Sequence, residues 1–284
     1  MTLDVVRSIA GCRAALAPVR AAGRSIGFVP TMGALHEGHL SLLDRARGLA
    51  DHVVLSIFVN PTQFDSGADL EAYPRDEARD LSLAGGRGAD LAFVPAVEEM
   101  YPSAPATRVT MRGITDRLEG AARPGHFDGV LTVVAKLFHI VQPDVAVFGM
   151  KDAQQAAAVG RMVADLDFPV RIELAPTLRE PDGLAASSRN VRLSPAERER
   201  ALAVPRAVAA AEAAFAAGET RAGAIEAAMR EALESAAGIE PEYAAVVGLD
   251  DFEPVERIER PSVAAVAARI GGVRLIDNAV LRPA

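Results

Sequence analysis

The sequence predicts an α/β protein, with a Rossmann-like parallel sheet in its N-terminal part and a smaller α+β domain at its C-terminal end. Short apolar runs alternate with amphipathic stretches through the first part of the chain, which favours parallel strands joined by right-handed helical crossovers. After about residue 177 the pattern changes to Ala-rich helices followed by closely spaced apolar runs. Because 284 residues suffice for two modest domains, we expect domains at 1–177 and 178–284.

Each expected element of the first domain rests on apolar spacing and on the residues that bound it. Pro30 is expected to end the first strand because proline cannot donate to a ladder. The expected strands are 26–29, 53–59, 89–94, 145–148 and 170–174, with 107–111 as a short edge strand. The expected helices are 4–22, the stretch from His36 that carries Leu40, Leu43, Ala46 and Ala50, 69–84 with an interruption near Tyr73, 130–141, and 151 to about 166.

The second domain begins its helices at a strong capping signal. Ser194 is a suitable N-cap, Pro195 suits the first helical position, and Glu197 completes a capping box. Two Ala-rich helices are expected at about 195–217 and 221–236, followed by strands at 243–247, 263–270 and 273–276. The pair Gly271-Gly272 between the last two strands predicts a β-hairpin.

Composition excludes several classes of function. A net charge of −8 argues against a broad nucleic-acid-binding surface, so we expect no nucleic-acid partner. The single cysteine, Cys12, permits neither an internal disulfide nor a cysteine metal cluster. The N-terminal residues lack a signal-peptide pattern, and no apolar run is long enough to span a membrane. We therefore expect a cytoplasmic protein without a membrane partner.

The most informative stretch is 26–40, where a buried strand is followed by a tight turn and a helix. His36 and His39 are three residues apart on the first turn of that helix, so they share a face. That face lies beyond the carboxyl end of the strand, where open α/β sheets bind ligands, and the free N–H groups of a helix start favour an anion. We expect a phosphate-binding site here.

Polar clusters also follow two other strands. Asn60 and Gln63 follow the second strand, and Lys151 with Asp152 follows the strand at 145–148. Because the carboxyl ends of parallel strands lie at one edge of a sheet, these clusters are expected to converge. Lysine and neutral amides beside two histidines suit a phosphate and a small polar ligand.

Five blocks carry a family resemblance, and they occur in the family's order. They are Pro30 to Leu40, Phe58 to Phe64, Arg123 to Val130, Phe148 to Gln155, and Ser187 to Asn190. Over nearly its whole length the chain resembles the pantoate–β-alanine ligase (pantothenate synthetase) family, within the larger group of His-x-Gly-His nucleotidyltransferases. Two positions depart from the family pattern: Met150 stands where glutamate is usual, and Ala153 where an aromatic residue is usual.

The resemblance implies that ATP and (R)-pantoate give an enzyme-bound pantoyl adenylate and pyrophosphate, after which β-alanine attacks to give pantothenate and AMP. It implies a catalytic role for His36, His39, Lys151, Ser188 and Arg189. It implies ATP contacts from Met32, His36, Gly38, His39, Gly149, Lys151, Asp152, Ser187, Ser188 and Arg189. It implies pantoate contacts from Pro30, Met32, Gln63, Gln155 and Arg123. It further implies Mg²⁺ held mainly by the ATP phosphates, a second domain that closes as a lid, and a homodimer.

Other interpretations compete with this one. His-Glu-Gly-His superficially resembles a zinc motif, but its histidines are three apart rather than four and no third ligand is evident. A nucleotidyltransferase of the same fold could act on another small acceptor, and a nucleotide sensor would bind without turnover. Met32 could be a core residue, whereas His126 and Phe127 are expected only to pack and cap their loop and are left out of the site. His52 and His139 are expected to be structural, and Tyr73 belongs either to the site or to a subunit interface.

Overall fold

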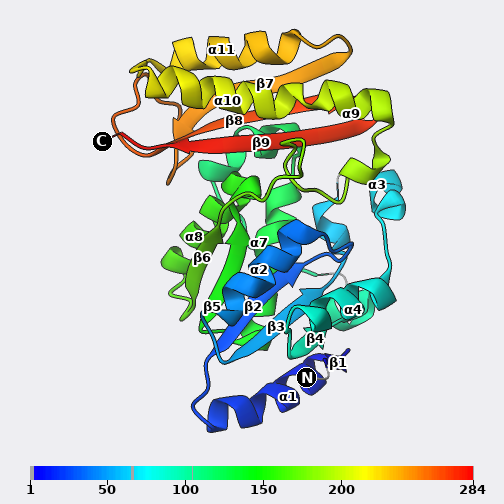
Figure 1. Cartoon of the computed structure of the whole chain (residues 1–284). Helices are drawn as coiled ribbons and strands as arrows, with labels where there is room; N and C mark the ends of the chain where they lie inside the picture. Colours follow the sequence, from blue (N-terminus) through cyan, green and yellow to red (C-terminus); the bar gives the residue numbers. More distant parts are fainter. Residues whose placement is uncertain (1–2, 65–66, 104, 284) are drawn as a thin grey trace.

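The computed structural model describes residues 3–64, 67–103 and 105–283. It contains a six-stranded parallel sheet covered by helices and a separate three-stranded antiparallel sheet that carries its own helices (Figure 1). The predicted fold class is confirmed: a Rossmann-like parallel sheet precedes a smaller α+β part.

The parallel sheet has the order β1-β4-β3-β2-β5-β6. Its strands are β1 (Asp4–Val6), β2 (Ile26–Thr31), β3 (His52–Ile57), β4 (Leu91–Phe93), β5 (Val145–Gly149) and β6 (Arg171–Ala175). From β2 the chain adds β3 and β4 on one side, and then crosses back to add β5 and β6 on the other. The order therefore reverses between β2 and β5, and open α/β sheets bind ligands at the carboxyl ends of the strands beside such a reversal.

Helices cover both faces of this sheet. The helices of this part of the chain are α1 (Ile9–Ala21), α2 (Glu37–Arg47), α3 (Gly67–Ala72), α4 (Glu77–Gly86), α5 (Val97–Met100), α6 (Glu119–Ala122), α7 (His126–Val141) and α8 (Ala153–Asp165), with 3-10 turns η1 (Pro61–Gln63), η2 (Ile114–Asp116) and η3 (Met150–Asp152). Successive strand residues point to opposite faces. Phe28 accordingly packs in the cluster with α1, α7 and α8, whereas Val29 packs in the cluster with α2 and α4.

The antiparallel sheet has the order β7-β8-β9, formed by β7 (Ile239–Gly248), β8 (Ser262–Ile270) and β9 (Val273–Leu281). A 3-10 turn η4 (Asn190–Arg192) and helices α9 (Pro195–Ala201), α10 (Ala203–Ala216) and α11 (Ala222–Glu234) precede it. Helices α10 and α11 cover one face of the sheet, with Val208 and Met229 in a shared core. Val263 and Ala265 instead belong to the cluster that includes α7 and α8, so the other face packs on the N-terminal part.

Several expected elements were wrong in the N-terminal half. Residues 4–6 form β1 rather than helix, because Ser8 caps α1 by accepting the Gly11 N–H at 3.0 Å. Pro30 does not end β2, which continues to Thr31. The pairing of β2 with β5 stops at Phe28, so Pro30 pairs only with β3 and needs no donor toward β5. Residues 107–111 form no strand, and the Val109 N–H is bonded to the Thr132 hydroxyl instead.

Helix boundaries also differ. The helix expected from residue 130 begins at His126, and the one expected from residue 151 begins at Ala153, after the turn η3. The long helix expected at 195–217 is divided at Leu202 into α9 and α10. The predicted capping box at Ser194 and Glu197 is present. The C-terminal strands are longer than expected, and β9 extends five residues past the predicted end at residue 276, to Leu281.

Candidate functional site

The loop between β2 and α2 is held by a buried carboxylate. Asp80 of α4 is 1% exposed and accepts the backbone N–H groups of Ala34 at 2.8 Å and Leu35 at 2.7 Å. Gly33 and Ala34 have positive φ angles of 81° and 49°, a conformation in which only glycine is free of strain. The Asp80 carboxylate therefore fixes a loop in which Ala34 holds a conformation that alanine disfavours, immediately before His36.

His36 is the N-cap of α2. Its Nδ1 accepts the Gly38 N–H at 3.1 Å, so in the neutral ring the proton is on Nε2. A Cβ at Gly38 would lie 2.8 Å from the His36 ring, which requires glycine there. His36 can therefore offer one N–H as a hydrogen-bond donor at the start of a helix, where backbone N–H groups also favour an anion.

His36 and His39 are packed together, with ring centroids 4.0 Å apart. Burial, together with the positive charge of Lys151, lowers the pKa of His36 to about 4. Burial, the neighbouring His36 and the charge of Lys151 together lower the pKa of His39 to about 3. Both rings are therefore neutral near pH 7 and act as hydrogen-bond donors rather than as charges. Nδ1 of His39 is buried without a hydrogen-bond partner, which costs free energy unless a ligand or water satisfies it.

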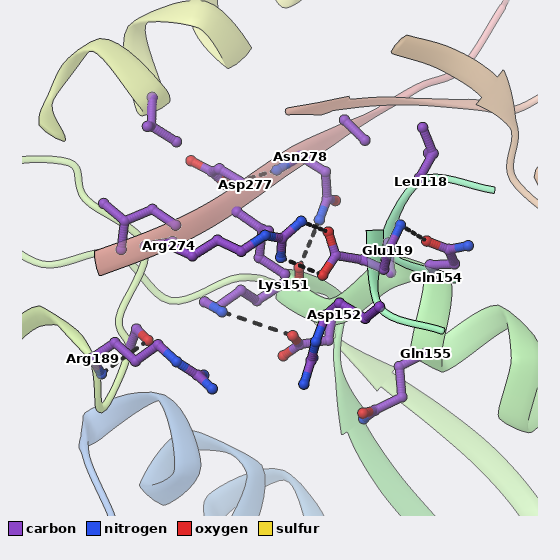
Figure 2. A pocket seen from close by; sticks show the side chains of 18 of the residues that line it. Leu118, Glu119, Lys151, Asp152, Gln154, Gln155, Arg189, Arg274, Asp277 and Asn278 are labelled. Carbon is purple, nitrogen blue, oxygen red and sulfur yellow. Dashed lines mark hydrogen bonds and ion pairs between the residues drawn. The ribbon is translucent and has the colours of Figure 1, made fainter. Parts of the chain in front are cut away.

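Lys151 and Asp152 lie in η3, directly after β5. The Lys151 Nζ is 3.8 Å from Oδ1 of Asp152, and the Lys151 side chain extends toward the side of the cavity on which Arg189 lies (Figure 2). Because β5 is the neighbour of β2, this lysine faces the histidine loop across the point where the strand order reverses.

The two glutamines that follow differ in their surroundings. Gln154 is buried and forms hydrogen bonds with the backbone of Ile114, Arg117 and Glu119, whereas Gln155 lines the cavity.

Gln63 is oriented by its neighbours. Nδ2 of Asn60 donates to Oε1 of Gln63 at 2.9 Å and to the Gly129 carbonyl at 3.2 Å. Since Oε1 is engaged, Nε2 is the group that Gln63 offers to a ligand. A Cβ at Gly129 would lie 2.3 Å from the Thr62 carbonyl oxygen, so only glycine lets α7 pack this closely on η1.

His126 was left out of the predicted site, but it lines the same cavity as Arg123 and Gln63. A nitrogen of Arg123 lies 3.1 Å from Nε2 of His126, and Nδ1 of His126 lies 2.8 Å from the Gln63 carbonyl. Arginine can only donate, so the His126 proton is on Nδ1 and is donated to Gln63. His126 therefore positions both neighbours, a role that its motif alone did not distinguish from loop packing.

A short hairpin at residues 178–186 leads into Ser187, Ser188 and Arg189. Its ladder includes the Ala186 N–H to Leu178 carbonyl bond of 2.9 Å and a bridge between Arg179 and Ala185. The Arg189 N–H donates to the Ser187 hydroxyl at 3.3 Å. Tyr73, which follows α3, is buried, lines the cavity and shares a side-chain hydrogen bond with Ser188, so it belongs to the site.

These segments surround one cavity of about 230 Å³. Every predicted site residue lines it: Pro30, Met32, His36, Gly38, His39, Gln63, Arg123, Gly149, Lys151, Asp152, Gln155, Ser187, Ser188 and Arg189. Arg123, Lys151 and Arg189 make it cationic, and Asp152 is the one carboxylate among its described lining residues. A second cavity of about 310 Å³ adjoins it at Lys151 and extends beneath β9 toward Arg274 (Figure 2).

The geometry bears on the zinc hydrolase interpretation and on the two histidines expected to be structural. In the described part of the chain, no group of three or more His, Cys, Asp or Glu side chains is arranged to hold a metal ion, which gives the zinc hydrolase interpretation no support. His52 lies 3.6 Å from Asp90, His139 packs on Phe168, and neither lines the cavity.

Among the described residues, no helix has both the length and the apolar character needed to cross a membrane.

The neutral histidines predict a pH-dependent stability. An unfolded histidine titrates near pH 6.5, whereas folded His36 and His39 titrate at about 4 and about 3. Between these values the unfolded state binds more protons, so the free energy of unfolding falls as pH falls. We expect a loss of about 2 kcal/mol for each histidine from pH 7 to pH 5. Urea unfolding of the unaltered chain and of His39→Asn measures it, and equal pH dependence in both would contradict it.

The fold and the cavity define an α/β protein whose cationic site lies where the strand order of the parallel sheet reverses. In open α/β sheets this is the place where nucleotides and other ligands bind. Comparison with known families identifies it more closely. The profile of the family described as Pantoate-beta-alanine ligase matches residues 4–280. The chain belongs to this family.

Individual relatives agree over almost their full length. The pantothenate synthetase of Acidothermus cellulolyticus is 54% identical over 99% of this chain and 92% of its own, and that of Rhizorhabdus wittichii is 49% identical over 99% and 100%. The crystal structure of pantothenate synthetase from Thermus thermophilus has a TM-score of 0.93 at 47% identity, covering 99% of this chain and 100% of its own. A pantoate-beta-alanine ligase from Francisella tularensis, complexed with beta-gamma ATP and beta-alanine, has a TM-score of 0.78 at 31% identity over 98% and 97%.

Proposed function

We propose that this chain is an ATP-dependent ligase that joins (R)-pantoate to β-alanine through a pantoyl adenylate. The observation that carries the proposal is the single cavity in which two neutral histidines, a lysine and neutral amide groups are gathered from separate loops. Family membership and the Francisella complex with an ATP species and beta-alanine support the same reaction. The protein is thus an AMP-forming enzyme that makes a carbon–nitrogen bond.

In the first step, a pantoate carboxylate oxygen attacks the α-phosphorus of ATP. The bond from that phosphorus to the bridging oxygen breaks, and pyrophosphate leaves with the electron pair. Both reactants are anionic, so the site must offset their repulsion and hold them in line. Lys151 and Arg189 supply positive charge, and His36 and His39 supply neutral N–H donors to the phosphates.

The remaining ATP contacts come from loops at the same edge. The backbone at Met32, Gly38 and Gly149 lets ATP approach closely. The hydroxyl groups of Ser187 and Ser188 donate hydrogen bonds to the phosphates, and the Asp152 carboxylate accepts hydrogen bonds from the ribose hydroxyls. At the other end, Nε2 of Gln63 donates to pantoate, with Gln155 as a second amide partner for its hydroxyls. Pro30 and Met32 give this end an apolar wall. Arg123 lies at the pantoate end, positioned by His126.

A magnesium ion fits this site as a companion of ATP. Since no cluster of three or more acidic, histidine or cysteine ligands occurs among the described residues, it would be held mainly by phosphate oxygens and water. When bound, it neutralises phosphate charge. The protein's own contribution is the set of cations and N–H donors named above.

In the second step, the β-alanine amine attacks the acyl carbon of the adenylate, AMP leaves, and the amine loses a proton. We propose that residues 178–284 form a separate domain that acts as a lid on 1–177 and excludes water from this mixed anhydride. We also propose that the protein is a cytoplasmic homodimer. Gel filtration with light scattering tests the dimer directly, since the expected mass is twice that of one 29.8 kDa chain.

The reaction is tested by supplying ATP and Mg²⁺ with pantoate and β-alanine, separately and together. We expect pantoate alone to support exchange of label between pyrophosphate and ATP, and both substrates to give AMP and pantothenate in equal amounts. β-Alanine alone should give neither. Pyrophosphate release that ignores pantoate and depends on another small acceptor would favour a nucleotidyltransferase of the same fold instead.

A further inference from the structure

Two adjacent residues of β9 contact the two cationic segments of the cavity from opposite faces of the strand. Asp277 and Asn278 are buried, at 1% and 8% exposure, and neither was among the predicted site residues. β9 is an edge strand of the antiparallel sheet. Because consecutive strand residues point to opposite faces, neighbouring side chains can hold two different parts of the structure.

Asn278 holds the turn that carries Lys151. Its Nδ2 donates to the carbonyl oxygens of Met150 and Lys151, both at 2.9 Å (Figure 2). Both N–H groups of the amide are therefore used on one 3-10 turn. Such a turn has few internal hydrogen bonds and weaker geometry than an α-helix. An external donor to two successive carbonyls consequently fixes the backbone from which the Lys151 side chain extends.

Asp277 holds the hairpin that leads into Ser187, Ser188 and Arg189. The Arg179 guanidinium donates to both carboxylate oxygens of Asp277, at 2.6 and 3.1 Å, and also to the Gly183 carbonyl at 3.1 Å. A bidentate pair fixes orientation as well as distance. Since Arg179 pairs with Ala185 across the hairpin, this contact sets where the chain enters the cavity.

We propose that Asp277 and Asn278 form a clamp that sets the spacing between Lys151 and the 187–189 segment, and so shapes the site for a triphosphate. This inference rests on the proposed function and deepens it. Both residues are positioning residues, because they act through Arg179 and through the η3 backbone. The C-terminal sheet is then part of the phosphate site itself, since one strand aligns cations that the N-terminal sheet and the hairpin supply.

The test compares the two half-reactions in isosteric variants. Asn278→Asp removes both donors, and Asp277→Asn removes the charge that Arg179 pairs with. We expect saturating pantoate-dependent ATP–pyrophosphate exchange to fall about 100-fold in either variant, the cost of misplacing a reacting group by about 1 Å. Attack of β-alanine on supplied pantoyl adenylate should fall less than about threefold, because that substrate has no β- or γ-phosphate. Equal losses in both half-reactions would overturn the clamp and leave a purely structural role.

A matched control is an ion pair that also joins the N-terminal part of the chain to the C-terminal part but does not line the cavity. Arg117 donates to Glu253, which lies between β7 and β8, at 2.6 Å. Glu253→Gln should leave both half-reactions unchanged, and a loss of exchange as large as in the clamp variants would overturn the proposal. Should Asp277→Asn or Asn278→Asp fail to fold, Arg179→Lys and Asn278→Ser make milder changes to the same contacts and are judged by the same two assays.

A binding measurement separates failure of the clamp from failure of the proposed function. If the unaltered chain shows no pantoate-dependent exchange, the proposed reaction is refuted. Calorimetric titration with inorganic pyrophosphate and Mg²⁺ requires no turnover. We expect the clamp variants to weaken this binding about tenfold, the loss of one charge-assisted hydrogen bond, and Glu253→Gln to leave it unchanged. Unchanged binding in the clamp variants would overturn the clamp independently of the reaction.

Discussion

Replacing Lys151 with alanine is expected to lower pantoate-dependent ATP–pyrophosphate exchange by about 1,000-fold while leaving the fold intact. Lys151 extends from the turn after β5 into the cavity, and its charge already acts on both histidines by lowering their pKa. In the transition state of adenylate formation, negative charge accumulates on the phosphates. Without the ammonium group, the neutral imidazoles remain as donors, but a source of positive charge opposite the leaving pyrophosphate is lost.

The chain offers a matched control, because it contains one other lysine, Lys136 on α7. That side chain lies 5.4 Å from the centre of the Tyr101 ring and does not line the cavity. Lys136→Ala should leave exchange unchanged. Lys151→Arg keeps the charge but replaces a compact ammonium with a planar fork, and is expected to recover only part of the rate. Normal exchange by Lys151→Ala would remove this residue from the reaction.

The sequence was sufficient to predict that the separate polar clusters lie together at one edge of the parallel sheet. A parallel sheet places the carboxyl ends of its strands at one edge, so the clusters after β2, β3 and β5 had to lie near one another once the alternating pattern was recognised. The family blocks then added Arg123 and the 187–189 segment, which no strand pattern locates.

What the sequence did not reveal were the residues that hold this site in place. His126 was interpreted as loop packing, because a histidine after glycine looks the same whether or not it bonds to an arginine. Asp277 and Asn278 lie just past the predicted end of the last strand. Asp80 lies on an ordinary amphipathic helix, 44 residues after His36 in the chain. Such contacts depend on the three-dimensional packing of distant segments, which local periodicity does not encode.

Replacing Asp80 is expected to have the second large effect, on stability and on activity together. In Asp80→Leu, the N–H groups of Ala34 and Leu35 lose their acceptor in a buried site, and the positive φ angles at Gly33 and Ala34 lose the contact that maintains them. We expect the free energy of unfolding to fall by about 3 kcal/mol, since buried donors left unpaired cost about 1 to 3 kcal/mol each. Chemical denaturation at pH 7.5 measures this change.

The activity of the Asp80 variants distinguishes two roles for the carboxylate. If it only stabilises the fold, Asp80→Asn assayed at low temperature, where the chain is folded, should catalyse adenylate formation normally. If it sets the loop that places His36, the folded variant should be at least about tenfold slower, because small displacements of a reacting group are costly. Asp76→Asn is the control at the start of the same helix, since the Asp76 side chain caps it by accepting the exposed Arg79 N–H at 3.1 Å. We expect it to cost about 1 kcal/mol or less and to leave the rate unchanged.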